Sequence, residues 1–218
     1  MPEFPIIERN RVRRVPKRGQ YDKDTIYRIL DEGLVCHVGV VEDGQPVVIP
    51  MNYARRDDTV ILHGAPASRL VKYVQAGHPV CVTVTLLDGL VLARSVYHHS
   101  MNYRSVVVFG RGRLIEAEQE KLAALEVLTE HILPGRWQVA RRPNRQELDA
   151  TAVVSIAIES ASAKVRTGPP ADDEDDYQLP VWAGVLPIQQ HTLTPVNDPR
   201  LRQDIPVPPS VSNYRRTR

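Results

Sequence analysis

Short runs of apolar and β-branched residues, separated by turn residues, make up most of the first half of the chain. Residues 34–41 and 47–53 are two such runs, and the Asp43-Gly44 step between them favours a tight turn, which predicts a β-hairpin. Residues 59–63 follow as a third strand. Since no crossover helix separates these runs, we expect them in meander order within an antiparallel sheet.

The pattern continues with further strands. Residues 80–87 and 90–96 flank Asp88-Gly89, which predicts a second hairpin, and residues 104–114 are almost continuously apolar. Late strands are expected within residues 152–158 and 177–188.

Three segments have helical features instead. Asp22 can cap a helix that Gly33 ends, Ser68 can cap one that runs to about Gln75, and residues 116–133 carry leucines at three- and four-residue spacing. The elements together predict a mainly β, antiparallel six-stranded split β-barrel with peripheral helices. We expect a basic arm over residues 1–18, the barrel domain over 19–193 and an extended tail over 194–218.

Composition limits the partners and the cellular compartment that we expect for this chain. The 218 residues carry a formal net charge of only +2, so we expect no nucleic-acid partner, and no apolar run is long enough for a membrane span. Cys36 and Cys81 both lie in apolar runs, which is typical of buried thiols in a reducing compartment. With no secretory signal pattern in residues 1–18, the expected location is the cytoplasm.

The first candidate site is the segment where a strand ends at Gly64 and a helix starts at Ser68. Unpaired N–H groups at a helix start favour a phosphate, and Ser68, Arg69 and Lys72 would add a hydroxyl and two cations. The alternative is that Ser68 is only an N-cap and that the two cations are solvated surface charges.

The second candidate is the polar cluster that begins at His98 and His99. Adjacent residues of an extended segment point to opposite faces and no third ligand is evident, so we expect hydrogen-bonded or exposed histidines and no metal.

Three motifs in order resemble a known family. Ser68-Arg69 after a strand, and the segment from Arg104 to Gly110, resemble the flavin-binding pattern of pyridoxamine 5′-phosphate oxidase. The chain is more similar to one branch of this family, the flavin-nucleotide-binding proteins that include 5-nitroimidazole reductases. This closer similarity rests on three further features: His63-Gly64, Asn102-Tyr103-Arg104-Ser105 and the late segment at Trp182.

The resemblance implies a homodimer that holds two FMN molecules in clefts between its subunits. Strand backbone would follow the flavin ring, His63 and Gly64 would lie beside it, Trp182 would approach from the second chain, and Ser105 replaces a glutamine of the oxidases. The implied cofactor-binding residues are Pro50, Met51, Asn52, His63, Gly64, Ser68, Arg69, Lys72, Asn102, Ser105 and Trp182.

Two departures from the oxidases bear on activity. Leu70 replaces a lysine of the oxidase pattern, for which Lys72 is the expected substitute, and the tail lacks the Arg-x-His substrate motif. Pyridoxamine phosphate oxidation is therefore not expected.

The resemblance implies an FMN-dependent oxidoreductase acting on a small organic molecule such as a nitro compound, with His63 as the catalytic residue on the substrate side. The alternatives are a non-catalytic flavin carrier or sensor, and a split barrel that binds another cofactor such as haem or a deazaflavin.

Overall fold

Alternating burial builds the first hairpin as expected. In β2 (Val35–Glu42) the side chains of Cys36, Val38 and Val40 face the core, and β3 (Gln45–Asn52) pairs with β2 along its whole length. Asp43 and Gly44 both have positive φ, 50° and 75°, as a two-residue turn between twisted strands requires.

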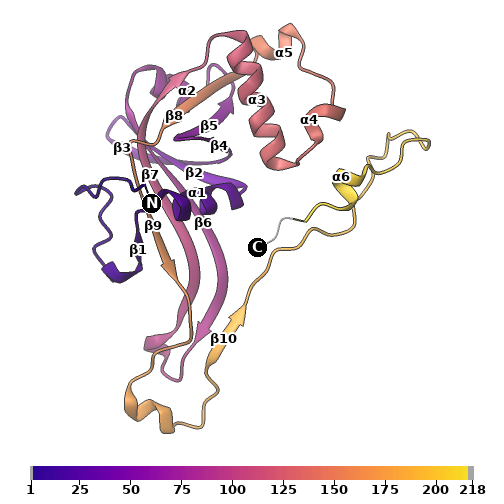
Figure 1. Cartoon of the computed structure of the whole chain (residues 1–218). Helices are drawn as coiled ribbons and strands as arrows, with labels where there is room; N and C mark the ends of the chain where they lie inside the picture. The colour runs from indigo at the N-terminus through magenta and orange to yellow at the C-terminus, as the bar shows by residue number, and fades with distance from the viewer. Residues whose placement is uncertain (1, 216–218) are drawn as a thin grey trace.

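The computed structural model describes residues 2–215; Met1 and residues 216–218, at the ends of the expected arm and tail, lie outside the described residues. All strand pairs are antiparallel, and the main path runs β3-β2-β6-β7-β8-β5-β4 (Figure 1). Residues 2–215 form ten strands rather than the expected six, and three of these strands, β1, β4 and β10, are only two to four residues long. The remaining strands are β1 (Gly19–Gln20), β4 (Ala54–Arg56), β5 (Thr59–Gly64), β6 (Pro79–Leu92), β7 (Ser100–Leu114), β8 (Ala152–Ala157), β9 (Ser160–Arg166) and β10 (Gly184–Pro187).

The expected hairpin at Asp88-Gly89 is wrong. β6 runs straight through these residues with a bulge between Leu87 and Gly89, and the chain reverses only beyond residue 92 to return as β7. Gly89 does not have the positive φ of a tight turn. It instead makes room for β10, since a Cβ at Gly89 would lie 3.0 Å from the Leu186 carbonyl oxygen.

The expected meander of three strands is also wrong. β5 pairs with β4 and β8, not with β3, because the chain leaves the first hairpin after Tyr53 and turns back tightly through Asp57, whose φ is 52°. The sequence pattern did not indicate β9, and the expected strand over 177–188 shortens to β10, after the 3-10 helix η3 (Glu174–Gln178).

The three expected helices are confirmed as α1 (Lys23–Glu32), α2 (Arg69–Gln75) and α3 (Glu118–Ile132). Asp22 caps α1 by accepting from the Thr25 amide at 2.8 Å, and Gly33 ends it. Further short helices are η1 (Pro16–Arg18), η2 (Val96–His98), α4 (Arg136–Val139), α5 (Arg145–Asp149) and α6 (Pro209–Ser212).

The core lies between the buried face of the sheet and the helices α1 and α2. Its largest fully buried side chain is Tyr53, whose hydroxyl donates to the Leu30 carbonyl of α1, and a second cluster around Ile61 and Leu128 packs under α3. Within residues 2–215, no helix is both long and apolar enough to cross a lipid bilayer.

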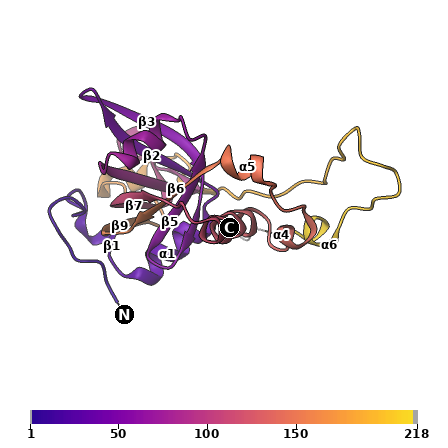
Figure 2. The ribbon, with the colours of Figure 1, turned by 90° about the horizontal axis from the view of Figure 1, so that it is seen from above.

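The two ends of the chain differ in how they pack against the barrel. Near the N-terminus Phe4 is buried in the core and Asn10 is only 3% exposed, so this segment packs against the barrel. The C-terminal segment after β10 runs away from the barrel, and α6 comes back near α4 (Figure 2).

Candidate functional site

The β5–α2 turn brings five of the expected flavin residues together. His63 and Gly64 end β5 and are half-buried, and Ser68 caps α2 by accepting from the Val71 amide at 3.4 Å. The Ser68 hydroxyl therefore does make the N-cap contact that was the alternative reading.

Charge at this turn is partly compensated. Arg69 Nε lies 2.8 Å from Glu42 Oε2 at the end of β2, and both side chains are about half exposed. Lys72 is exposed one turn further along α2 and has no ion-pair partner within residues 2–215. An incoming phosphate would have to displace Glu42 from Arg69, and Lys72 is the cation at this turn that stays open to it.

The three expected residues of β3 do not face one way. Pro50 pairs with His37 of β2 and is exposed on the outward face, whereas Met51 pairs with Cys36 and packs against the core. Asn52 is half-buried beside Val35 at the end of the strand. Pro50 and the strand backbone are thus the parts of β3 that a ligand on the outer face can reach.

Asn102 and Ser105 already have partners within the chain. Asn102 is 8% exposed, accepts from Arg166 and donates to the Gly168 carbonyl at 3.2 Å. Ser105 donates to the Lys164 carbonyl at 3.4 Å. Asn102 therefore fixes the start of the loop that follows β9, and any role toward a cofactor stays a prediction.

Trp182 lies far from the β5–α2 turn. Its side chain is 67% exposed and covers Gly184, where a Cβ would lie 2.8 Å from the indole ring. Gly184 pairs with Leu92, the last residue of β6, and the 14 residues of β6 span about 43 Å from the end near α2 (Figure 1). One chain alone does not bring Trp182 to the turn.

Arg104 carries a role that the sequence analysis missed. Its guanidinium binds Asp88 of β6 and Glu32 of α1, and these two carboxylates raise the pKa of Arg104. The only signal in the sequence was an acidic residue at an apparent turn, Asp88, and the resemblance motif gave Arg104 no contact.

The two adjacent histidines make hydrogen bonds, as expected. His98 Nε2 lies 3.3 Å from Asp173, and His99 Nδ1 lies 3.0 Å from the Ser95 carbonyl oxygen. A third group does join His98, since ligand atoms of Asp173 and Asp176 lie within 4.8 Å of it and of each other. The sequence could not show this, because η3 and η2 come together only through the fold.

The loop before η3 is anchored to the end of β6. The side chain of Asp172 is enclosed and accepts from the Arg94 and Ser95 amides at 3.0 and 3.3 Å, and from the Arg94 guanidinium at 3.1 Å. Burial alone would raise the pKa of Asp172, but these hydrogen bonds outweigh it and lower that pKa. Asp172 is therefore the fixed point of the acidic run over residues 172–176.

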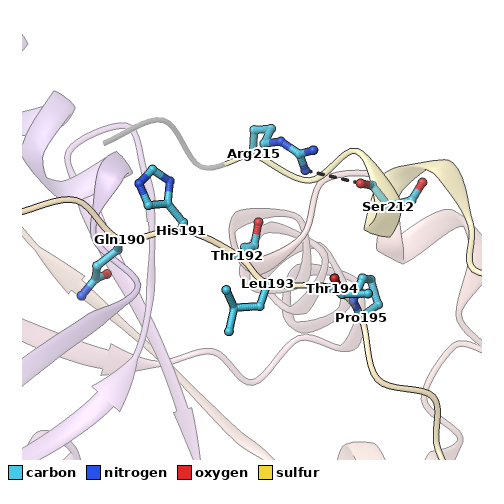
Figure 3. A pocket seen from close by; sticks show the side chains of 8 residues that line it. All are labelled: Gln190, His191, Thr192, Leu193, Thr194, Pro195, Ser212 and Arg215. Atoms are coloured by element: carbon cyan, nitrogen blue, oxygen red, sulfur yellow. Dashed lines mark hydrogen bonds between the residues drawn. The ribbon is translucent and has the colours of Figure 1, made fainter.

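A cavity of about 450 Å³ lies in the C-terminal segment (Figure 3). Both of its walls come from that segment, with His191 and Leu193 on one side and Ser212 and Arg215 on the other. It contains none of the residues expected to bind flavin.

Comparisons with known proteins agree with the fold. A family model described as pyridoxamine 5′-phosphate oxidase matches residues 22–165. The structure of the flavocytochrome Anf3 from Azotobacter vinelandii matches with a TM-score of 0.91 and 43% identity, covering 98% of this chain and 99% of that one.

Two further solved structures extend this comparison. The FAD and haem binding protein from Mycobacterium smegmatis has a TM-score of 0.86 and 34% identity, over 90% of this chain and 96% of that one. A 5-nitroimidazole antibiotic resistance protein from Bacteroides thetaiotaomicron, itself described as putative, has a TM-score of 0.59 and 26% identity, over 67% of this chain and 86% of that one. No curated protein sequence matches.

The family model covers well over half of the chain, and the first two structures are similar over nearly its whole length. The resemblance seen in the sequence motifs is therefore confirmed. The chain belongs to the pyridoxamine 5′-phosphate oxidase family and has the mainly β, flavin-binding split-barrel fold of that family.

Proposed function

We propose that this chain forms a homodimer that binds both a flavin and a haem and passes electrons between small molecules and these two cofactors. The observation that carries the proposal is the similarity, over at least 90% of the chain, to two proteins described as a flavocytochrome and as an FAD and haem binding protein. Flavin and haem together supply two-electron and one-electron chemistry.

The distribution of the expected flavin residues supports a dimer. His63, Gly64 and Arg69 gather at one end of the barrel, whereas Trp182 lies at the far end of the β6–β7 ribbon (Figure 1). A second copy, placed in the opposite direction, would bring its Trp182 to the turn of the first. The flavin site of one chain is then completed by the other.

The outward face of the first hairpin offers a surface for that second copy. Val35, Val41 and Val48 are 51%, 54% and 62% exposed on β2 and β3, and Leu87 is 42% exposed on β6. Apolar side chains gathered on one sheet face are typical of a protein–protein interface. Elution of the purified protein as a monomer in size-exclusion chromatography with light scattering would contradict the dimer.

Two histidines, His63 and His99, are suited to serve as the axial ligand of a haem. His99 donates its Nδ1 proton to the Ser95 carbonyl, because a carbonyl only accepts, and its Nε2 is left as a ligand atom; metal-binding histidines are commonly oriented in this way. His63 is half-buried and has no hydrogen-bond partner within residues 2–215. His63 would then serve either the haem or the substrate side of the flavin.

The first experiment is an absorption spectrum of the protein purified from cells supplied with haem precursor, with mass spectrometry of the released cofactors. We expect flavin absorption bands, a Soret band and a single flavin species. The similarity to the Mycobacterium smegmatis protein favours FAD as that species, whereas the sequence motifs favoured FMN. Absence of both flavin and haem, even after reconstitution, would contradict the proposal.

Variants then assign the haem ligand. We expect His63→Ala or His99→Ala to abolish or shift the Soret band. His78→Ala replaces an exposed histidine that packs on the Tyr73 ring, and it should leave the Soret band unchanged. If both test variants keep the wild-type Soret band, the ligand assignment is wrong.

A second candidate is reduction of nitro compounds, which the similarity to the putative 5-nitroimidazole resistance protein favours. Reduced protein mixed with a 5-nitroimidazole would be reoxidised with loss of the nitro absorbance. A rate no greater than that of the free flavin would remove this candidate and leave electron transfer or flavin carriage.

A further inference from the structure

A small basic cavity lies on the opposite side of β7 from the core. The N-terminal residues 9–14, which we call the arginine loop, cross the outward face of β7 and β9 and enclose a space of about 290 Å³. Its walls include Arg9, Arg13 and Arg14 from the loop, Ser105 from β7, and Ser162 and Lys164 from β9. Of the residues expected to bind flavin, the lining of this cavity includes only Ser105.

The arginine loop has a fixed position. Asn10 is buried and its Nδ2 donates to the carbonyls of Ala161 and Pro5, both at 2.9 Å, while its Oδ1 accepts from the Ile7 amide at 2.8 Å. The Val12 amide donates to the Tyr21 hydroxyl at 2.9 Å. The cations of the loop are therefore held over the sheet in a defined arrangement.

Positive charge exceeds negative charge around the cavity. The two carboxylates nearby are already shared, since Glu8 pairs with Arg11 and Arg13 and Glu159 lies 3.5 Å from Arg9. Arg14 and Lys164 have no carboxylate partner in the part of the chain described here. The exposed pairs contribute little energy and can rearrange around a stronger anion.

We propose that this cavity binds the phosphate or diphosphate group of a small phosphorylated molecule. Guanidinium groups bind phosphate oxygens in pairs, and the Lys164 ammonium adds a point charge from the sheet. A cavity of about 290 Å³ suits such a group rather than a whole dinucleotide. By contrast, Arg69 at the β5–α2 turn faces a carboxylate, Glu42.

Calorimetric titration of the purified protein with inorganic pyrophosphate tests the site directly. We expect Arg14→Gln and Lys164→Gln each to weaken pyrophosphate binding about tenfold, the usual cost of one charge-assisted contact. Arg56→Gln, on β4 at the other edge of the sheet, makes the same charge change and should bind as the wild type does. No measurable pyrophosphate binding, or equal weakening by all three variants, overturns the proposal.

Parallel titrations with FMN, FAD and ADP identify the source of the phosphate. If the two variants weaken FAD but not FMN, the site holds the diphosphate of the flavin; if they weaken ADP and leave both flavins unchanged, it holds a separate ligand. Tighter binding of an oligonucleotide than of pyrophosphate, with a steep salt dependence, would overturn the small-molecule assignment. If the wild type binds neither flavin, the proposed function is overturned, but pyrophosphate binding would still support the basic cavity as a phosphate site.

Discussion

Arg104 on β7 binds Asp88 on β6 through two parallel hydrogen bonds, Nε to Oδ2 at 2.9 Å and NH2 to Oδ1 at 2.7 Å. The same guanidinium reaches Glu32 at the end of α1, with NH2 to Oε1 at 2.8 Å. One side chain thus connects the bulge of β6 to α1, which packs against the core, and all three groups are largely shielded from water.

Replacing Arg104 with alanine should destabilise the fold strongly. Asp88 would lose both of its hydrogen bonds from Arg104, and Glu32 would lose the guanidinium that it shares with Asp88, which we expect to cost about 3 kcal/mol in the free energy of unfolding. Arg145→Ala, which breaks only exposed pairs with Glu118 and Asp149, should change it little. Urea unfolding of both variants measures the difference, and equal losses would contradict the role given to Arg104.

This contact explains why the sequence pattern misled at Asp88-Gly89. The dipeptide is a strong turn signal by itself, but the Asp88 carboxylate is bound across the ladder and Gly89 lies against β10, so the extended strand prevails. Both partners are distant in sequence. Local turn propensity therefore predicted a reversal that tertiary contacts override.

Elements governed by local contacts were predictable. The cap of α1 by Asp22, the cap of α2 by Ser68 and the turn at Asp43-Gly44 all depend on residues within a few positions of one another. The candidate flavin site likewise has a part that local sequence predicts and a part that it does not. The motif located Ser68 and Arg69 at a helix start, but the contact of Arg69 with Glu42 comes from a strand 27 positions away.

The N-cap of α1 should make stability depend on acid pH. Burial alone would raise the pKa of Asp22, but hydrogen bonds from Thr25 outweigh it and hold that pKa below its usual value. The stabilisation is present above the unfolded-state pKa and is lost as the pH falls through the lower folded-state pKa. Asp22→Asn keeps a capping group without a titrating carboxyl.

Unfolding free energies measured between neutral pH and about pH 3 should therefore fall more steeply for the wild type than for Asp22→Asn. Asp22→Ala should cost about 1 kcal/mol near neutral pH, where the cap is intact in the wild type. Identical pH profiles for the wild type and Asp22→Asn would show that the Asp22 carboxyl does not contribute.

Two strand glycines form a matched pair for a packing test. A Cβ at Gly110 of β7 would lie 1.8 Å from the Ala157 carbonyl oxygen, whereas the nearest atom to a Cβ at Gly39 of β2 is 3.6 Å away. Gly110→Ala must push β8 away from β7, so we expect a loss of about 3 kcal/mol or failure to fold. Gly39→Ala should unfold at nearly the wild-type denaturant concentration, and similar behaviour of the two variants would contradict this packing.

The two thiols should differ in reactivity. Burial raises the pKa of Cys36 to about 12, and burial also raises the pKa of Cys81, which is only partly enclosed on the outward face of β6. Because the thiolate is the reactive form, iodoacetamide at neutral pH should label Cys81 slowly and Cys36 only after unfolding. Peptide mass spectrometry measures both, and labelling of Cys36 in the native protein would contradict its burial.

We expect Asn10 to hold the arginine loop against the barrel. Asn10→Ala removes the donors to the Ala161 and Pro5 carbonyls, at an expected cost of about 2 kcal/mol, and frees the loop from β9. Trypsin cuts after arginine in mobile segments, so we expect the variant to be cut rapidly within residues 9–14. The wild type should be cut there slowly.

Asn144→Ala is the control for this experiment, because it removes the cap of α5 without touching the arm. If the wild type and Asn10→Ala lose the arm at the same rate, the loop is not held by Asn10, and a fixed basic cavity beneath it would lose its support. If only Asn10→Ala is cut, pyrophosphate should also bind this variant more weakly, because the cations of the loop are no longer held over Lys164.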